Sequence, residues 1–151
     1  MKARSKALAD NATTRVFVYG TLREDAHNDM YQSLAGASTL LGDASVNGDL
    51  YDLGAYPGLL LTNEPSSVVH GEVYELKPDR AVQIIAVLDE YEGCGASAPA
   101  PHEYKRELIR VRLESGETTT AWAYLLNRDP AGLNRIPGGD YLSWRRQAGA
   151  A

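Results

Sequence analysis

The strongest constraint on the fold is an apolar run over residues 16–19, Val-Phe-Val-Tyr, that stops abruptly at Gly20. Its β-branched and aromatic side chains predict a buried strand, although a buried helical segment of this length has the same pattern. Because Gly20 has no Cβ, the backbone there can turn sharply or be approached closely. Backbone amides in such a turn can converge on a carboxylate or an oxyanion, whereas the simpler interpretation is a strand that ends in a loop.

Glycines also divide the middle of the chain. They punctuate residues 38–61 at four places: Gly42, Gly48, Gly54 and Pro57-Gly58. Asn47-Gly48 is a tight-turn signal, so this region is predicted to hold short strands. Another strand is predicted over residues 68–76, with Gly71 as a candidate β-bulge. So many glycines in a β pattern are more typical of a small barrel or a strongly bent sheet than of a doubly wound α/β fold.

Three helices and a hairpin complete the predicted elements. The clearest helix covers residues 78–91, because Pro78 suits its first turn and Asp79 suits the positive end of its dipole. Gly93 then offers a left-handed stop. The other elements are a short helix that starts at Asn28 or Asp29 and ends near Gly36, a hairpin of residues 103–113 and 117–126 around Ser115-Gly116, and a last helix over residues 144–147.

Length, composition and net charge limit the kind of protein that this chain can be. With 151 residues, 44% hydrophobic and 23% charged, the chain suits one globular domain, expected over residues 15–147 after a flexible tail at 1–14. Its net charge of −5 argues against a broad nucleic-acid interface. No run approaches the roughly 18 apolar residues of a membrane span, and the basic residues near the start lack the apolar segment of a signal peptide. A cytoplasmic, soluble protein is the default expectation.

Cysteine and histidine usage argues against several kinds of site. Cys94 is the only cysteine, so neither an intrachain disulfide nor a cysteine-rich metal site can form. Nothing near Cys94 in the sequence supplies a base, which favours a structural role over a nucleophilic one. The three histidines, His27, His70 and His102, lack metal-ligand spacing, so no metal is expected.

Charged residues alternate along the predicted strand at 103–113. Basic side chains are interleaved with acidic ones: Lys105, Arg106, Arg110 and Arg112 with Glu103, Glu107 and Glu114. This alternation predicts a solvated face.

A carboxylate on the apolar face of the predicted helix is the main functional candidate. On a wheel of ~100° per residue, one stripe holds Ala81, Ile84, Ile85, Leu88 and Tyr91. Glu92 falls inside this stripe, whereas Asp89 lies at its edge and Glu90 points to solvent. Desolvation would raise the pKa of Glu92 and make it a competent general base near neutral pH. The alternatives are that the helix frays at Gly93 and Glu92 turns outward, or that Asp89 acts as second acid in a paired-carboxylate hydrolase.

Two stretches carry a family resemblance: residues 18–23, Val-Tyr-Gly-Thr-Leu-Arg, and residues 88–93, Leu-Asp-Glu-Tyr-Glu-Gly. Together with their spacing, they resemble the gamma-glutamylcyclotransferase-like family, also called the AIG2-like family. Further agreement lies in Tyr56-Pro57-Gly58, the strand at 69–76 with Gly71, Tyr104-x-Arg106, Trp122-Ala123-Tyr124 and Gly139-Asp140-Tyr141. The resemblance covers roughly residues 15–145.

The resemblance implies an α+β fold, a small mixed β-barrel flanked by helices. It also implies that the loop after the first strand binds the glutamyl moiety, through Tyr19, Gly20, Thr21 and Leu22. Glu92 would be the catalytic acid/base. We add Tyr124 as a candidate for the pocket wall, because its strand position permits it and aromatic residues line such cavities.

The implied activity is that of a gamma-glutamyl cyclotransferase, an acyltransferase or lyase that releases 5-oxoproline from a small gamma-glutamyl amine or amino acid. The substrate's own α-amine attacks its γ-carbonyl while Glu92 moves the proton, so no metal, cofactor or covalent intermediate is required. Two alternatives stay open: a non-catalytic member that binds a small carboxylate, and removal of a gamma-glutamyl group from a carrier-tethered biosynthetic intermediate. The segment from Cys94 to His102 is a candidate for setting leaving-group specificity, and nothing in the sequence indicates the oligomeric state.

Overall fold

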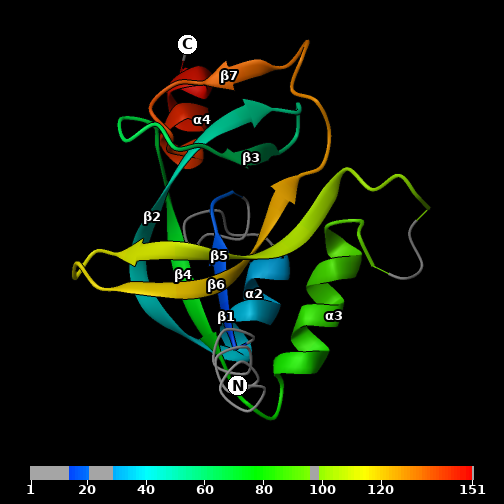
Figure 1. Ribbon diagram of the computed structural model, residues 1–151. Coiled ribbons are helices and arrows are strands. Elements are labelled where there is room, and N and C mark those ends of the chain that lie inside the picture. The colour runs from blue at the N-terminus through cyan, green and yellow to red at the C-terminus, as the bar shows by residue number, and fades with distance from the viewer. Residues whose placement is uncertain (1–13, 21–28, 96–98, 151) are drawn as a thin grey trace, which may run out of the picture.

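The computed structural model describes residues 14–20, 29–95 and 99–150, and in this part of the chain it contains seven strands and three helices (Figure 1). The elements in order are β1 Arg15–Val18, α2 Asp29–Gly36, β2 Ser38–Asp52, β3 Pro57–Leu61, β4 Val68–Leu76, α3 Ala81–Tyr91, β5 Tyr104–Leu113, β6 Thr118–Leu126, β7 Asn134–Ile136 and α4 Tyr141–Ala150. The predicted tail covers residues 1–14, of which residues 1–13 lie outside the described residues. None of the described helices has the length and apolar character needed to cross a membrane.

Five of the strands close into a ring. β1 pairs antiparallel with β4, β4 with β2, and β2 with β3. Parallel pairing of β3 with β6, and of β6 with β1, then completes the circle. β5 joins outside the ring through β6 and β2, and β7 through β2. The predicted small mixed β-barrel flanked by helices is therefore confirmed (Figure 1).

β1 is buried on both of its faces. Phe17 and Tyr19 belong to a core cluster inside the barrel, which also contains Leu50, Leu59 and Val73. Val16 and Val18 point the other way, into a second cluster that α2 and α3 cover with Leu34, Ile84 and Leu88. A strand buried on both sides has no polar alternation, which explains the continuous apolar run in the sequence. The strand interpretation of residues 16–19 is confirmed.

The glycines of β2 do not break it, contrary to the prediction of short strands. β2 is continuous over 15 residues, and its one register irregularity lies between Leu40 and Gly42. Asn47-Gly48 marks a change of partner instead of a turn, because residues 38–47 pair with β4 and residues 48–52 pair with β3. A Cβ on Gly48 would lie 2.7 Å from the Leu60 carbonyl oxygen, so only glycine allows β3 to approach.

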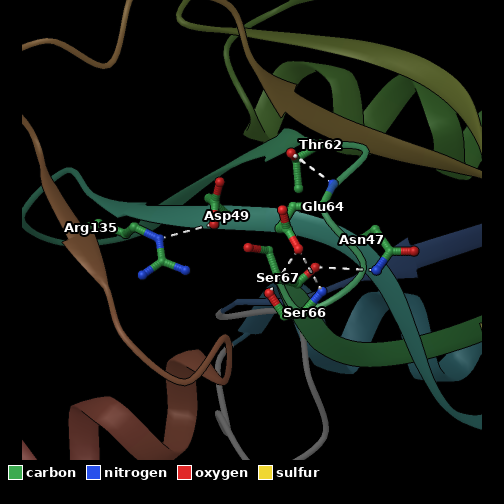
Figure 2. A network of polar contacts seen from close by, with 7 residues as sticks. All are labelled: Asn47, Asp49, Thr62, Glu64, Ser66, Ser67 and Arg135. Atoms are coloured by element: carbon green, nitrogen blue, oxygen red, sulfur yellow. Dashed lines mark hydrogen bonds and ion pairs between the residues drawn. The ribbon is translucent and has the colours of Figure 1, made fainter.

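The partner change is supported by polar contacts from the segment that joins β3 to β4 (Figure 2). The Asn47 side-chain amide donates to the Ser67 carbonyl oxygen at 3.3 Å, and the Gly48 amide donates to the same oxygen at 3.0 Å. On the neighbouring stretch of β2, Asp49 pairs with Arg135 of β7 at 2.9 Å. These contacts link β2, at the place where it changes partner, to the β3–β4 segment and to β7.

Most other predicted elements are confirmed, with shifted ends. The short helix and the hairpin around Gly116 are present as predicted. α3 starts three residues later than expected, and α4 starts earlier, at Tyr141, because the Asp140 carboxylate accepts the amide of Ser143 at 3.1 Å and caps the helix. β7 was not predicted. The bulge predicted at Gly71 is wrong, because Gly71 pairs in register with Ala44.

Gly71 gives the first test of this packing. A Cβ there would overlap the Val18 carbonyl oxygen and lie 2.8 Å from the Phe17 ring, because Gly71 lies beside the end of β1, with which β4 pairs. We expect Gly71→Ala to lower the free energy of unfolding by about 3 kcal/mol, measured by urea denaturation. Gly36→Ala is the matched control, because a Cβ on Gly36 meets nothing within 4 Å, and it should change stability by less than about 0.5 kcal/mol. Equal stabilities of the two variants would contradict the packing described for β1.

Candidate active site

A pocket of about 510 Å³ opens beside the end of β1. Its wall is formed by the end of β1 with Gly20, by residues 55–57, by the end of α3 with Gly93, by Glu103 and Tyr104, and by Tyr124 of β6. Of the residues proposed from the sequence, Tyr19, Gly20, Glu92 and Tyr124 lie on this wall, and Thr21 and Leu22 lie outside the described residues. Segments far apart in the chain thus meet around one cavity.

The end of α3 places Glu92 on the wall. Ala81, Ile84 and Leu88 are buried against the barrel, and the Glu92 amide still donates to the Leu88 carbonyl oxygen at 2.9 Å. Gly93 follows with a φ of +74°. The Gly93 amide donates to the Glu90 carbonyl oxygen at 3.1 Å, and the Cys94 amide donates to the Asp89 carbonyl oxygen at 2.9 Å. This pair of hydrogen bonds is a Schellman motif. Instead of fraying, the helix ends at Tyr91 and Glu92 caps it in a helical conformation, so the Glu92 side chain stays on the inner stripe.

The carboxyl group of Glu92 is withdrawn from water without a compensating cation. Burial raises its pKa from the ordinary 4.5 to about 7. Among the described residues, no Lys, Arg or His forms an ion pair with it, and the pocket wall carries none of these residue types. Near neutral pH the group is therefore divided between its acid and its base form, as proton transfer in both directions requires.

Tyrosine hydroxyls hold the wall in place. Tyr19 donates to the carbonyl oxygen of Tyr124, and Tyr104 donates to the carbonyl oxygen of Pro57 at 2.5 Å. Burial raises the pKa of Tyr19 well above its ordinary value, and the nearby Glu92 charge adds to the shift. Gly20 sits against the ring of Pro57, where a Cβ would come within 3.0 Å. The close approach predicted at Gly20 is thus a contact with the chain's own proline ring.

Asp89 anchors the helix and does not line the pocket. Its carboxylate accepts two hydrogen bonds from the Arg106 guanidinium, at 2.8 and 3.3 Å, and one from the Tyr124 hydroxyl at 2.7 Å. The guanidinium in turn lies 4.2 Å from the centre of the Trp122 ring. Since both oxygens are occupied, this geometry does not support the paired-carboxylate alternative. The expectation that Arg106 lies on a solvated face is wrong, because its side chain is partly buried between α3 and β6.

Glu103 and Tyr56 are pocket residues that the sequence analysis did not single out. Glu103 was assigned to the solvated face, yet it lies on the wall and accepts a hydrogen bond from Tyr56 at 2.7 Å. The available signal was its position directly before Tyr104, the buried first residue of β5. The described part of the segment 94–102 lies off the wall, although Gly93 and Glu103, its immediate neighbours, lie on it.

Cys94 and the described histidines are not placed for chemistry. Burial raises the pKa of the Cys94 thiol to about 11, with the charges of Asp89 and Glu92 adding to the shift, so the thiolate is scarce at neutral pH. Within the ranges that the structure covers, no group of three or more His, Cys, Asp and Glu side chains could hold a metal ion.

Comparison with known proteins points to one family. The sequence pattern of the family described as gamma-glutamyl cyclotransferase, AIG2-like matches residues 16–143. The chain is 41% identical over 115 residues to the gamma-L-glutamyl-butirosin B gamma-glutamyl cyclotransferase of Niallia circulans, covering 76% of this chain and 67% of that protein.

Two solved structures are also similar. The protein ytfP from Escherichia coli is 36% identical, with a TM-score of 0.57 over 85% of this chain and 96% of that one. YkqA from Bacillus subtilis shares the fold at 24% identity, with a TM-score of 0.67 over 91% of this chain. The chain spans only 43% of the length of YkqA.

The raised pKa of Glu92 leads to a prediction about how the free energy of unfolding depends on pH. The folded-state pKa of about 7 exceeds the ordinary 4.5, so the folded protein gains stability when Glu92 is protonated and loses it as pH rises from about 4.5 to 7. Glu92→Gln removes this loss. We expect the variant to be more stable than the wild type above pH 7, by about 3 kcal/mol at most, and to lose the advantage near pH 4.5.

Urea denaturation of both proteins across this pH range measures the difference. A variant that is less stable than the wild type at pH 8 would contradict the desolvation of Glu92.

Proposed function

The chain belongs to the gamma-glutamyl cyclotransferase, AIG2-like family, and from this premise we propose that it releases 5-oxoproline from a small gamma-glutamyl amine or amino acid. The observation that carries the proposal is Glu92, a desolvated carboxyl group without a cationic partner among the described residues, on the wall of a pocket large enough for a small molecule. The proposed class is an acyltransferase or lyase that needs neither metal nor cofactor.

Glu92 carries two protons, one after the other, from the α-nitrogen to the leaving nitrogen in the proposed reaction. Its carboxylate accepts a proton from the substrate's α-ammonium, and the freed amine attacks the γ-carbonyl carbon. A carbon–nitrogen bond to the α-nitrogen forms, which closes the five-membered ring. Glu92 returns the first proton to the leaving nitrogen as the bond to that nitrogen breaks. The ring nitrogen gives its second proton to the Glu92 carboxylate, which passes it to the departing amine. The products are 5-oxoproline and the protonated amine, Glu92 is again a carboxylate, and no water is consumed.

The end of β1 and the neighbouring aromatic residues orient the substrate in this proposal. Amides at Gly20, Thr21 and Leu22 bind the α-carboxylate or the developing oxyanion, while Tyr19 and Tyr124 form the wall beside them. Since the attacking and leaving groups belong to one molecule, the pocket only has to hold the substrate folded. Asp89 acts as a positioning residue, because it ties the end of α3 to β5 and β6 three residues before Glu92.

A substrate that arises in biosynthesis is the second candidate. The Niallia circulans relative is named for a gamma-glutamyl derivative of butirosin B. The identity of 41% with that protein favours, for this chain, removal of a gamma-glutamyl group from a biosynthetic intermediate by the same chemistry. Binding of a small carboxylate without turnover is the non-catalytic alternative.

Glu92→Gln tests the proposed role directly. We expect the variant to lower kcat for 5-oxoproline release by about 10³-fold, because the amide cannot accept the proton. Glu107→Gln, which removes an exposed carboxylate paired with Lys105 at 3.6 Å, is the control for loss of one charge. The assay uses a panel of gamma-glutamyl amines, dipeptides and ε-lysine conjugates. Turnover retained by the Glu92 variant would remove Glu92 from the mechanism, and binding of the panel without product would support the non-catalytic alternative.

The pH dependence of the reaction gives an independent test. Glu92 must be ionised to accept the proton, so kcat/KM should rise with pH and level off above an apparent pKa of about 7. Below that pH each further unit should lower kcat/KM about tenfold. Steady-state rates between about pH 5 and pH 8 measure the curve. A rate that is flat down to pH 5 would contradict a base with this pKa.

A further inference from the structure

The pocket contains a second carboxylate, Glu103, for which the proposed chemistry has no use. Glu92 and Glu103 are the acidic residues of the described wall, and no lysine, arginine or histidine lies on it. Glu92 is occupied by the α-ammonium, whose proton it must remove. The charge of Glu103 is therefore left for another part of the substrate.

Glu103 is held in position by the pocket's own aromatic residues. One of its oxygens accepts the Tyr56 hydroxyl at 2.7 Å, and the Tyr56 ring packs against Tyr104 with the ring centres 5.9 Å apart. Tyr104 is fixed by its hydrogen bond to the Pro57 carbonyl oxygen. Among the described residues, nothing donates to the second oxygen of Glu103. A fixed carboxylate with an open oxygen binds a cation without reorganising first.

No basic side chain of the described residues pairs with Glu103, although some other acids of this chain have such a partner. In the described part of the structure Asp89 pairs with Arg106, and Asp49 with Arg135. Lys105 lies only two residues from Glu103, yet it pairs with Glu107 at 3.6 Å. Exposed acids such as Glu64 and Glu117 also form no ion pair among the described residues, so what distinguishes Glu103 is its position on the pocket wall with Glu92.

The tyrosines around the pocket suit a cationic ligand as well. The hydroxyls of Tyr19, Tyr56, Tyr104 and Tyr124 are all donated to protein acceptors. These hydroxyls have no proton left to donate to a ligand, so the tyrosines offer it their rings and the lone pairs of their hydroxyl oxygens, and both attract an ammonium group. The same attraction operates within the protein, where the Arg106 guanidinium lies over the Trp122 ring.

We propose that Glu103 selects the amine half of the substrate, and that the preferred substrates are gamma-glutamyl amides whose leaving amine carries a second, positively charged amino group. The inference rests on the proposed function, because it assigns the α-ammonium to Glu92. Tyr56 acts as a positioning residue, since it holds the Glu103 carboxylate. The free product is then a diamine or polyamine, or a larger molecule that carries such a group.

Matched substrates test the proposal. The probes are gamma-glutamyl amides of linear diamines of increasing length, and amides of amino alcohols of the same lengths, which lack the charge. We expect the wild type to favour the best diamine amide by tenfold or more in kcat/KM, mainly through KM. Glu103→Gln should bring this ratio close to one, and Tyr56→Phe should lower it in part. Glu107→Gln removes the same charge outside the pocket and should leave the ratio unchanged.

The outcomes separate this inference from the proposed function. Equal turnover of both substrate series by the wild type would overturn the selection by Glu103 and leave the cyclotransferase function standing. A Glu103→Gln variant that loses the same factor on both series would also overturn it, because Glu103 would then bind the shared glutamyl half. If neither series gives 5-oxoproline, the proposed function fails. Binding of the two series, measured by calorimetry, then tests the selection of charge by Glu103 separately. Tighter binding of the diamine amides that is lost in Glu103→Gln supports charge selection, and equal or absent binding overturns it.

Discussion

The site depends on the way in which α3 ends. A helix that continued past Glu92 would carry the chain away from the barrel, and one that frayed earlier would release the carboxylate to water. Gly93 adopts a left-handed conformation, and the amides of Gly93 and Cys94 satisfy the last carbonyl groups of the helix. The carboxylate is thereby held on the buried stripe of α3, and loss of water alone raises its pKa to about 7.

The barrel provides the surface against which this helix end is fixed. β1 is buried on both faces, so it stands between the barrel interior and the layer that contains α3. The Asp89–Arg106–Tyr124 contacts then tie α3 to β5 and β6. Because β1, β5 and β6 also contribute wall residues, the elements that anchor the helix are the ones that shape the pocket.

Local patterns in the sequence predicted the parts of this structure that have local causes. The wheel placed Glu92 on the inner stripe, and the apolar run identified β1, because both follow from the periodicity of one element. The role of Gly48 was mistaken, since the approach of β3 that requires a glycine comes from elsewhere in the chain. Arg106 and Glu103 were assigned to solvent for the same reason. Their partners, Asp89 and Tyr56, are 17 and 47 residues away in the sequence.

The central claim is that Glu92 is a carboxyl group whose pKa is raised by burial, and a direct titration tests it. The side-chain carboxyl carbon of Glu92 can be followed by ¹³C NMR in protein labelled at glutamate, with its signal assigned by its loss in Glu92→Gln. We predict a midpoint at about pH 7. A midpoint near the ordinary 4.5 would show that the group is solvated, and would contradict its proposed role as the base.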